Sequence, residues 1–238
     1  MESETLNLPV LALRGLTVFP HTNLTFDVER HISMKALEVA METGQEIFLV
    51  TQREINVEKP TEQDLYVIGT ISRVTQILRL GQNSLRVMVE GGRRARLKRL
   101  WQLEPYLQGQ VETAEEPESV NHGPKTEALL RQTWSLFQDY AQLAGNVAEE
   151  VIAAALDCQE PGDLADLIAQ NIALRYDDKQ AILEELSPLV RLRKLNGFLA
   201  RERDVLGYER QMEGKVRDTL ARNQRDQILR TQIRVLQN

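Results

Sequence analysis

The residue pair Gly214-Lys215 comes closest to a recognisable chemistry, since a glycine-rich loop that ends in lysine binds the phosphates of nucleotides. Glu209, however, occupies the position of the first glycine in that motif, and Val216 occupies the position of the serine or threonine that holds magnesium. The sequence therefore predicts no phosphate-binding loop in this chain.

The histidines and the single cysteine also lack the spacing of a catalytic or metal site. His21, His31 and His122 follow no ligand or acid–base pattern, so we interpret them as ordinary loop residues. Cys158 has acidic neighbours, which raise the pKa of a thiol. We expect no catalytic residue, no metal site and no cofactor. A single cysteine fits the reducing cytoplasm, which is the location we expect.

A dense basic cluster between residues 93 and 99 has two interpretations. Its side chains can bind phosphates, which suits a nucleic-acid-binding strand. Alternation with Ala95 and Leu97 fits a solvated strand instead, because basic side chains protect an exposed sheet edge. We favour the solvated strand, since the acidic middle of the chain argues against nucleic acid. The nucleic-acid interpretation rests on Arg93, Arg94, Arg96, Lys98 and Arg99.

Charge falls into three blocks along the 238 residues, whose formal net charge is −6. Residues 1–111 are balanced, residues 112–190 hold 16 acidic against 4 basic side chains, and residues 191–238 hold 12 basic against 6 acidic ones. Such blocks indicate separate structural units. The hydrophobic fraction of 42% is enough for a folded core, and no apolar run approaches the roughly 20 residues of a membrane-spanning helix. We expect a folded protein with no membrane partner.

The first block has the pattern of short strands separated by turns. Gly81-Gln82-Asn83-Ser84 is the clearest hairpin turn. Ser33, followed by apolar residues at helical spacing up to Gly44, predicts one helix. Six or more strands with one helix favour a curled antiparallel sheet or a small barrel over a parallel sheet. The expected strands cover residues 8–13, 24–28, 46–51, 67–80, 85–90, 94–100 and 108–113.

A polar, proline-bearing stretch at 115–124 predicts a linker, after which the apolar period becomes 3.6 residues. Four short helices are expected before Ser187-Pro188, where a long helix begins that lacks a stop signal, as in a piece of a longer protein. The expected fold class is α+β. Its units are a β-rich region at 1–115, an acidic helical bundle at 116–187 and a long linker helix at 188–238.

Blocks of residues spread over nearly the whole chain are specific enough to compare with known families. They include 8–20 (LPVLALRGLTVFP), 46–52 (EIFLVTQ), 60–71 (PTEQDLYVIGTI), 86–96 (RVMVEGGRRAR) and 224–233 (QRDQILRTQI). Together these blocks resemble the N-terminal region of the bacterial Lon family of ATP-dependent AAA+ proteases. Departures at Asn23, at Thr25 and in the turn 81–84 affect two loops.

The resemblance implies a PUA-like β domain and a noncatalytic role. In that family this region binds unfolded or damaged proteins, helps to organise a hexamer and delivers polypeptide to the ring. ATP and magnesium, together with the Ser-Lys proteolytic dyad, belong to other parts of the full-length protein. We therefore expect unfolded proteins and other Lon subunits as partners.

A receptor for unfolded protein needs exposed apolar side chains or a free strand edge, because its clients share no fixed shape. The residues beside the hairpin turn are candidates for both features. The alternative is that most of them are core residues. The candidate set is Leu78, Leu80, Leu85 and Met88, with Val10, Phe19 and Pro20 as an extension of the patch.

Overall fold

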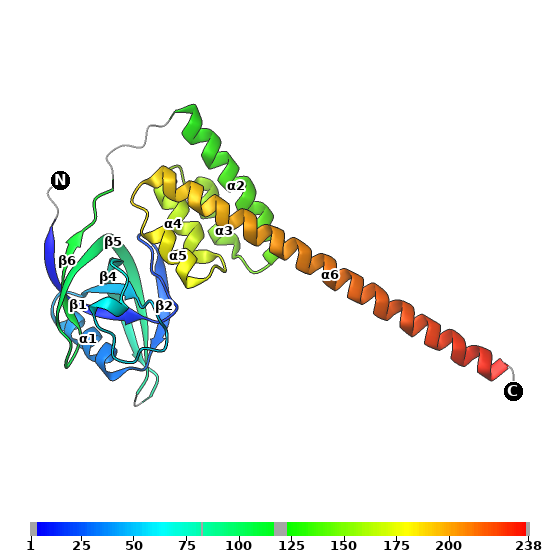
Figure 1. Cartoon of the computed structure of the whole chain (residues 1–238), viewed down its shortest axis with the longest axis horizontal. Helices are drawn as coiled ribbons and strands as arrows, with labels where there is room; N and C mark the ends of the chain where they lie inside the picture. Colours follow the sequence, from blue (N-terminus) through cyan, green and yellow to red (C-terminus); the bar gives the residue numbers. More distant parts are fainter. Residues whose placement is uncertain (1–3, 82, 117–122, 237–238) are drawn as a thin grey trace.

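The computed structural model describes residues 4–81, 83–116 and 123–236, with side chains placed throughout except at 221, 223 and 226–236. A β-barrel lies beside a helical bundle, and one long helix runs out of the bundle (Figure 1). The α+β class predicted from the sequence is confirmed. No helix within the described ranges combines the length and apolar character needed to cross a membrane.

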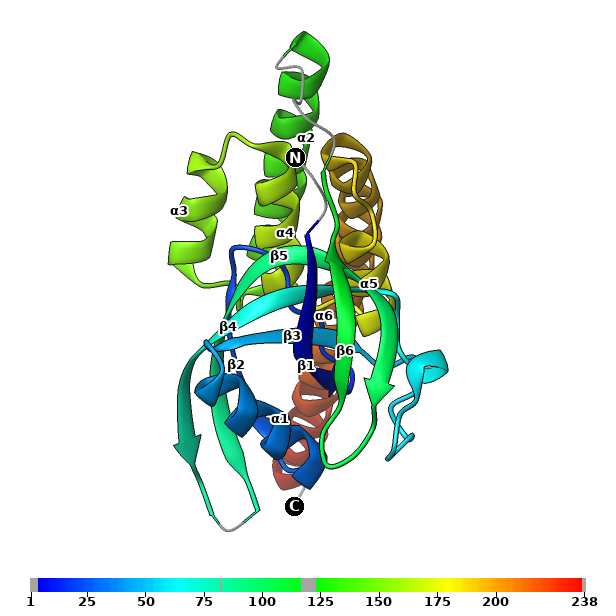
Figure 2. The same ribbon diagram turned by 90° about the vertical axis from the view of Figure 1, so that its left-hand side faces the viewer.

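Six strands form one sheet in the order β2-β5-β4-β3-β1-β6. Strand β6 also pairs with β5, so the sheet closes into the barrel seen in Figure 2. The bounds are β1 Thr5–Leu13, β2 Asn23–Val28, β3 Glu46–Thr51, β4 Ile68–Arg79, β5 Leu85–Gln102 and β6 Gln108–Thr113.

One pairing differs from the antiparallel expectation, because β1 and β3 are parallel. Between them the chain forms β2 and helix α1 (His31–Glu42), which is long enough for the crossover that a parallel pair requires. Helix α1 begins before Ser33, which lies buried inside it and is not its N-cap. The short 3-10 helix η1 (Glu62–Asp64) lies between β3 and β4.

The position of strand β1 between two apolar clusters explains why its sequence is apolar without alternation. Leu11 and Leu13 pack into one cluster with helix α1, whereas Val10 and Ala12 pack into a second cluster on the other face. Both faces of β1 are therefore buried, and every second position is as apolar as its neighbours.

Strand β5 runs for 18 residues, where the sequence predicted two strands. Gly91 lies at the predicted break, yet β5 continues through it. The amide of Gly91 donates to the carbonyl oxygen of Thr22, and its own carbonyl accepts from His21. The lack of a Cβ allows this segment to approach β5 closely, so the glycine bends the strand without ending it.

Four short helices follow the barrel: α2 Pro124–Ala144, α3 Glu149–Asp157, α4 Pro161–Asn171 and α5 Tyr176–Leu183. Helix α2 is closed by Gly145, whose φ of 69° is the left-handed conformation that favours glycine. The central residues of the predicted linker, 117–122, lie outside the described residues and include His122.

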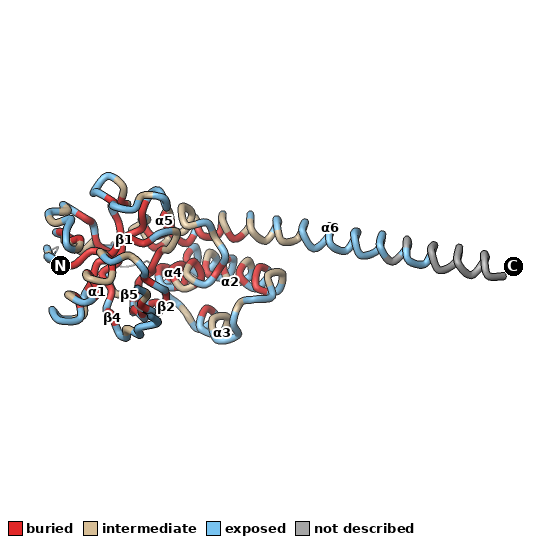
Figure 3. Tube along the Cα trace, turned by 90° about the horizontal axis from the view of Figure 1, so that it is seen from below, coloured by how far each residue is buried: buried red, intermediate tan, exposed pale blue. Residues whose placement is uncertain are grey.

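Helix α6 (Pro188–Leu236) begins at the predicted proline and continues for 49 residues. Its first turns belong to the bundle, because Leu192, Leu195 and Leu199 are fully buried in the core that α2, α4 and α5 also form. Figure 3 shows the helix passing from buried to exposed as it leaves the bundle. The helix continues unbroken through Gly197, Gly207 and Gly214.

Replacing Gly91 with alanine should destabilise the barrel, because the new Cβ would lie 2.0 Å from the carbonyl oxygen of Phe19. We expect the free energy of unfolding, measured by urea denaturation, to fall by at least about 2 kcal/mol. Gly81→Ala is the matched control, since no atom of the described residues, apart from its chain neighbours, lies within 4 Å of its Cβ position. It should change stability by less than about 0.5 kcal/mol. Equal effects of the two substitutions would contradict the close approach.

Candidate functional site

The β4–β5 hairpin carries exposed apolar side chains beside its turn. Leu78, Leu80 and Met88 are 53%, 46% and 41% exposed, and we call these three residues the hairpin patch. Met88 pairs across the ladder with Gln76, and Leu78 pairs with Arg86. Leu78 and Met88 are therefore diagonal neighbours on the outer face, within reach of one bound side chain.

Polar groups border the hairpin patch. Thr25 on β2 pairs with Met88. Arg86 binds Asp27 through two hydrogen bonds, 2.7 Å from Nε to Oδ1 and 2.9 Å from Nη2 to Oδ2. These bonds hold the pKa of the Asp27 carboxyl below its usual value. The patch is thus a small apolar surface with a polar rim, which suits reversible contact with apolar side chains.

Four of the predicted patch residues are buried, and their prediction as exposed contacts is wrong. Leu85 is 5% exposed because it alternates with Arg86 and faces the barrel interior. Val10 is 1% exposed, since both faces of β1 are covered. Phe19 is inaccessible to solvent, because its side chain packs into the core of the helical bundle. Pro20 is also buried, beside a cavity of about 700 Å³ between the barrel and α4.

The basic strand does not present one free cationic face. Arg94 is 4% exposed and points into the junction with the bundle, so its assignment to a nucleic-acid surface is wrong. Arg93 pairs with Glu4 at 3.0 Å, and Lys98 pairs with Glu112 at 2.8 Å. The two remaining candidates, Arg96 and Arg99, are exposed. This arrangement fits the solvated-strand interpretation better than a phosphate-binding surface.

Arg94 is the centre of a buried ionic cluster that joins the barrel to the bundle. Its Nη1 and Nη2 atoms donate to the two carboxylate oxygens of Asp166 on α4, at 2.8 and 2.6 Å. Its Nε atom donates to the carbonyl oxygen of Leu183 at the end of α5. Nη1 also donates to Glu116, which precedes the undescribed part of the linker, at 3.0 Å. One side chain thereby contacts three separate segments.

Arg191 adds helix α6 to the same cluster. Its Nη2 atom donates to Glu116 at 2.7 Å, and its Nη1 atom lies 3.5 Å from Asp166. Arg191 is fully buried and Asp166 is 2% exposed. Burial raises the pKa of the Asp166 carboxyl, and the two guanidinium groups oppose that rise. We call Arg94, Glu116, Asp166 and Arg191 the junction cluster.

Sequence reasoning missed three members of the junction cluster, although a signal was present for two of them. Asp166 interrupts an apolar run on α4. Arg191 precedes Leu195 and Leu199 at intervals of four residues, so it lies on the buried face of α6. A charge on an apolar helix face implies a buried partner. Glu116 carries no comparable signal, because it lies in a polar acidic stretch.

The structure places the other sequence candidates apart from one another. Gly214 and Lys215 lie inside α6, where the helical backbone forms no loop around a phosphate. His21 and His31 are exposed on separate elements. Burial raises the pKa of the Cys158 thiol. Within the described ranges, no group of three histidine, cysteine or acidic side chains is placed to hold a metal ion.

The free part of α6 carries a second exposed apolar surface. Its residues follow one another at intervals of four, so they share a face of the helix. We call them the α6 stripe: Tyr208, Met212, Val216 and Leu220, which are 58–68% exposed. In Figure 3 this part of the helix extends away from the bundle, and no other described element covers it.

Comparison with known families agrees with this architecture. The sequence model described as "ATP-dependent protease La (LON) substrate-binding domain" matches residues 7–201. The chain therefore belongs to the Lon substrate-binding domain family. The resemblance seen in the sequence blocks is confirmed, as is the prediction that the chain corresponds to a noncatalytic region of that family.

Curated relatives and solved structures lead to the same family. Lon protease from Desulforamulus reducens is 38% identical and Lon protease 1 from Bacillus subtilis is 35% identical, each over 97% of this chain. The alignments cover 28% and 30% of those relatives, so the chain spans less than a third of their length. The N-terminal domain of Mycobacterium avium complex Lon protease shares the fold, with a TM-score of 0.66 and 21% identity over 82% of this chain and 98% of that one.

Substituting Asp166 by asparagine should strongly destabilise the chain, because Arg94 and Arg191 would keep their buried charges without a full counter-charge. Breaking a buried pair in this way costs about 3–5 kcal/mol. We expect a loss of that size in the free energy of unfolding from urea titration. Asp163→Asn, an exposed change on the same helix, is the control. A loss of less than about 1 kcal/mol at Asp166 would show that the cluster contributes little.

Proposed function

We propose that this chain recognises unfolded or damaged proteins through the hairpin patch, and that within a whole Lon protease it delivers them towards the proteolytic ring. The observation that carries the proposal is the exposure of Leu78, Leu80 and Met88 on one hairpin of a domain whose family is described as substrate-binding. Folded proteins bury such side chains, whereas unfolded clients offer the same kind of surface.

The composition of the hairpin patch supports binding of varied clients. Methionine is unbranched and polarizable, so Met88 can adapt to side chains of different shape. The polar rim formed by Asp27 and Arg86 limits the apolar area, which keeps the contact reversible. A tight and specific pocket would suit one ligand, but a shallow apolar surface suits many.

Delivery and assembly are the second part of the proposal. A helix of 49 residues rises about 1.5 Å per residue, which gives roughly 75 Å and carries its end far from the barrel. An apolar stripe on such a helix is stabilised when a partner covers it. We therefore assign the α6 stripe to contacts between subunits, consistent with a role in organising a hexamer.

The remaining expectations extend this proposal. ATP and magnesium are assigned to other parts of a whole Lon protease, and this chain is assigned no cofactor of its own. The single cysteine supports a cytoplasmic location, because one cysteine cannot form a disulfide within the chain, as is usual for proteins of the reducing cytoplasm. No observation on the basic strand supports nucleic acid as a partner, and we do not propose it.

Replacing Leu78 and Met88 together by aspartate should weaken binding of a denatured client at least about tenfold, because two apolar contacts are lost and two charges are placed on the surface. Binding can be measured by fluorescence anisotropy with a labelled, permanently unfolded protein. Circular dichroism should show an unchanged fold, since both side chains point outward.

The matched control is the pair Met41→Asp and Val67→Asp, which changes apolar residues of 38% and 41% exposure away from the hairpin turn. This control should bind the client as the unchanged chain does. If the Leu78 and Met88 variant is folded and captures the client equally well, the hairpin patch is not the site.

Substituting Met212 and Val216 by lysine should reduce self-association of the chain, because the apolar face of α6 then carries charge. Sedimentation velocity over a range of concentrations measures the effect, with a shift of at least about tenfold expected in the association constant. Asp218→Lys adds a lysine on the opposite face of the helix and should leave association unchanged. Equal behaviour of the three proteins would remove the assembly role of the stripe.

A further inference from the structure

One edge of the hairpin is only half covered by the barrel. Strand β3 pairs with β4 as far as the partners Glu46 and Arg73. One more backbone bond, from the amide of Val74 to the carbonyl oxygen of Gln45, ends that ladder. Beyond it, β4 residues 75–79 pair only with β5, and no described strand lies on their other side.

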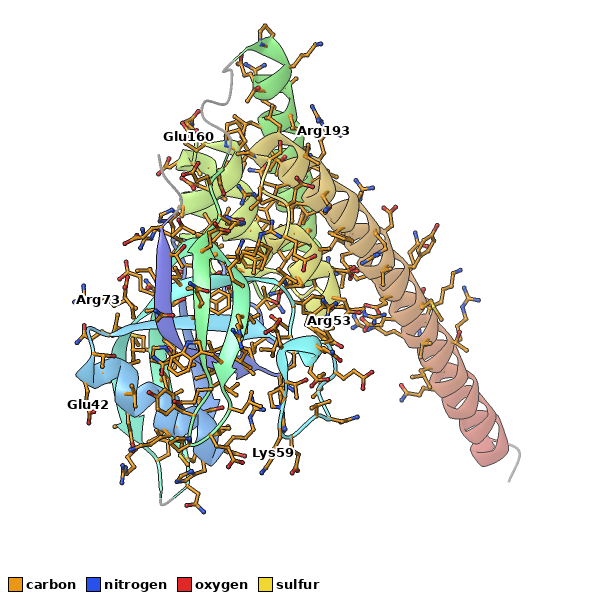
Figure 4. The ribbon with its side chains drawn as sticks, turned by 60° about the vertical axis from the view of Figure 1, so that its left-hand side comes forward. Glu42, Arg53, Lys59, Arg73, Glu160 and Arg193 are labelled. Carbon is orange, nitrogen blue, oxygen red and sulfur yellow. The ribbon has the colours of Figure 1, made fainter. Side chains whose placement is uncertain are left out.

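The reason for the half-covered edge is the turn that precedes β3. Gln45 has a φ of 69°, a left-handed conformation that turns the chain from helix α1 into β3. Strand β3 therefore starts level with Arg73, whereas β4 continues for six more residues. Figure 4 shows Arg73 projecting from the side of the barrel away from the helical bundle. No described strand therefore occupies the position in line with β3 beside residues 75–79.

An open strand edge presents alternate backbone N–H and C=O groups that an extended chain can bind. Proline or charged side chains would protect such an edge from pairing. Residues 75–78 include neither, and Arg79 at the end of the edge is the one charged residue of this segment. The bulge at residue 75 lies next to the covered part, so residues 76–79 keep a regular register with β5.

The side chains along this edge favour an apolar strand as occupant. Leu78 is exposed on the outer face, and Ile77 is half-buried on the inner face, where it packs against the cluster that contains helix α1. A strand added beside them would have apolar neighbours on both faces. Strand β2, the other open edge of this ribbon, instead has Asn23, Thr25 and Asp27 on its outer face.

We propose that residues 75–79 of β4 bind an extended segment of an unfolded client as an added β-strand, with main-chain hydrogen bonds supplying affinity and the hairpin patch supplying side-chain contacts. The inference rests on the proposed function and specifies how the client is held. Recognition through the main chain requires no particular sequence, and an unfolded client has far more unpaired main chain to offer than a folded protein, whose strands are mostly paired. This mode therefore selects for the unfolded state as well as for apolar character.

The test uses the full chain and three labelled peptides of about eight residues with alternating valine and threonine, long enough to cover the edge. One peptide is unmodified, and the other two carry N-methyl groups on the odd or on the even residues. Only alternate residues of an added strand bond to its neighbour. We expect one methylated peptide to bind about tenfold or more weakly and the other to bind like the unmodified peptide.

Amide hydrogen exchange locates the bound peptide. We expect alternate amides within 75–79 to become protected when the unmodified peptide binds. Binding of both methylated peptides as tightly as the unmodified one, with no protection of amides within 75–79, would show contact through side chains alone and overturn the added strand, while leaving the proposed function intact. Protection confined to 23–28, or protection of 75–79 that grows with protein concentration without peptide, would also overturn it. Failure of all three peptides and of denatured client to bind would refute the proposed function itself.

Discussion

The buried pair between Arg94 and Asp166 is the interaction on which the arrangement of this chain depends. Each charge would be costly to bury alone, so the two elements that carry them, β5 and α4, must meet in one orientation for both to be satisfied. Glu116 and Arg191 then tie the end of the barrel region and the start of α6 to the same point. The direction in which α6 leaves the molecule is therefore fixed relative to the barrel.

This junction separates two kinds of surface. The β4–β5 hairpin turn lies at the end of the barrel away from the bundle (Figure 1). Leu78 and Met88, near this turn, are exposed to solvent. The bundle covers the first turns of α6 and leaves the remainder exposed, including the α6 stripe. In the proposed role, the buried ion pairs of the junction cluster would hold these two surfaces in one relative position.

Much of the fold followed from sequence patterns. Apolar alternation and turn residues located the β4–β5 hairpin, and the 3.6-residue period and Pro188 located the helical region and the start of α6. The predicted division of β5 into two strands was wrong. A glycine can mark either the end of a strand or a bend within it, and only the close approach of Phe19 to Gly91 shows that this glycine lies within the strand. The parallel pairing of β1 and β3 depends on how the crossover packs, which a local pattern does not contain.

The sequence by itself determined the family, the α+β class and the hairpin from which Leu78, Leu80 and Met88 project, since these depend on residue order and short-range periodicity. Only the tertiary structure decided which apolar residues are accessible. Val10 and Leu78 look equally apolar in the sequence, yet one lies between two packed clusters and the other faces water. It also decided that Arg94 is a buried structural charge, because its partners Glu116, Asp166 and Leu183 lie 22, 72 and 89 positions further along the chain. Burial and ion pairing are set by contacts between distant segments, so no local pattern specifies them.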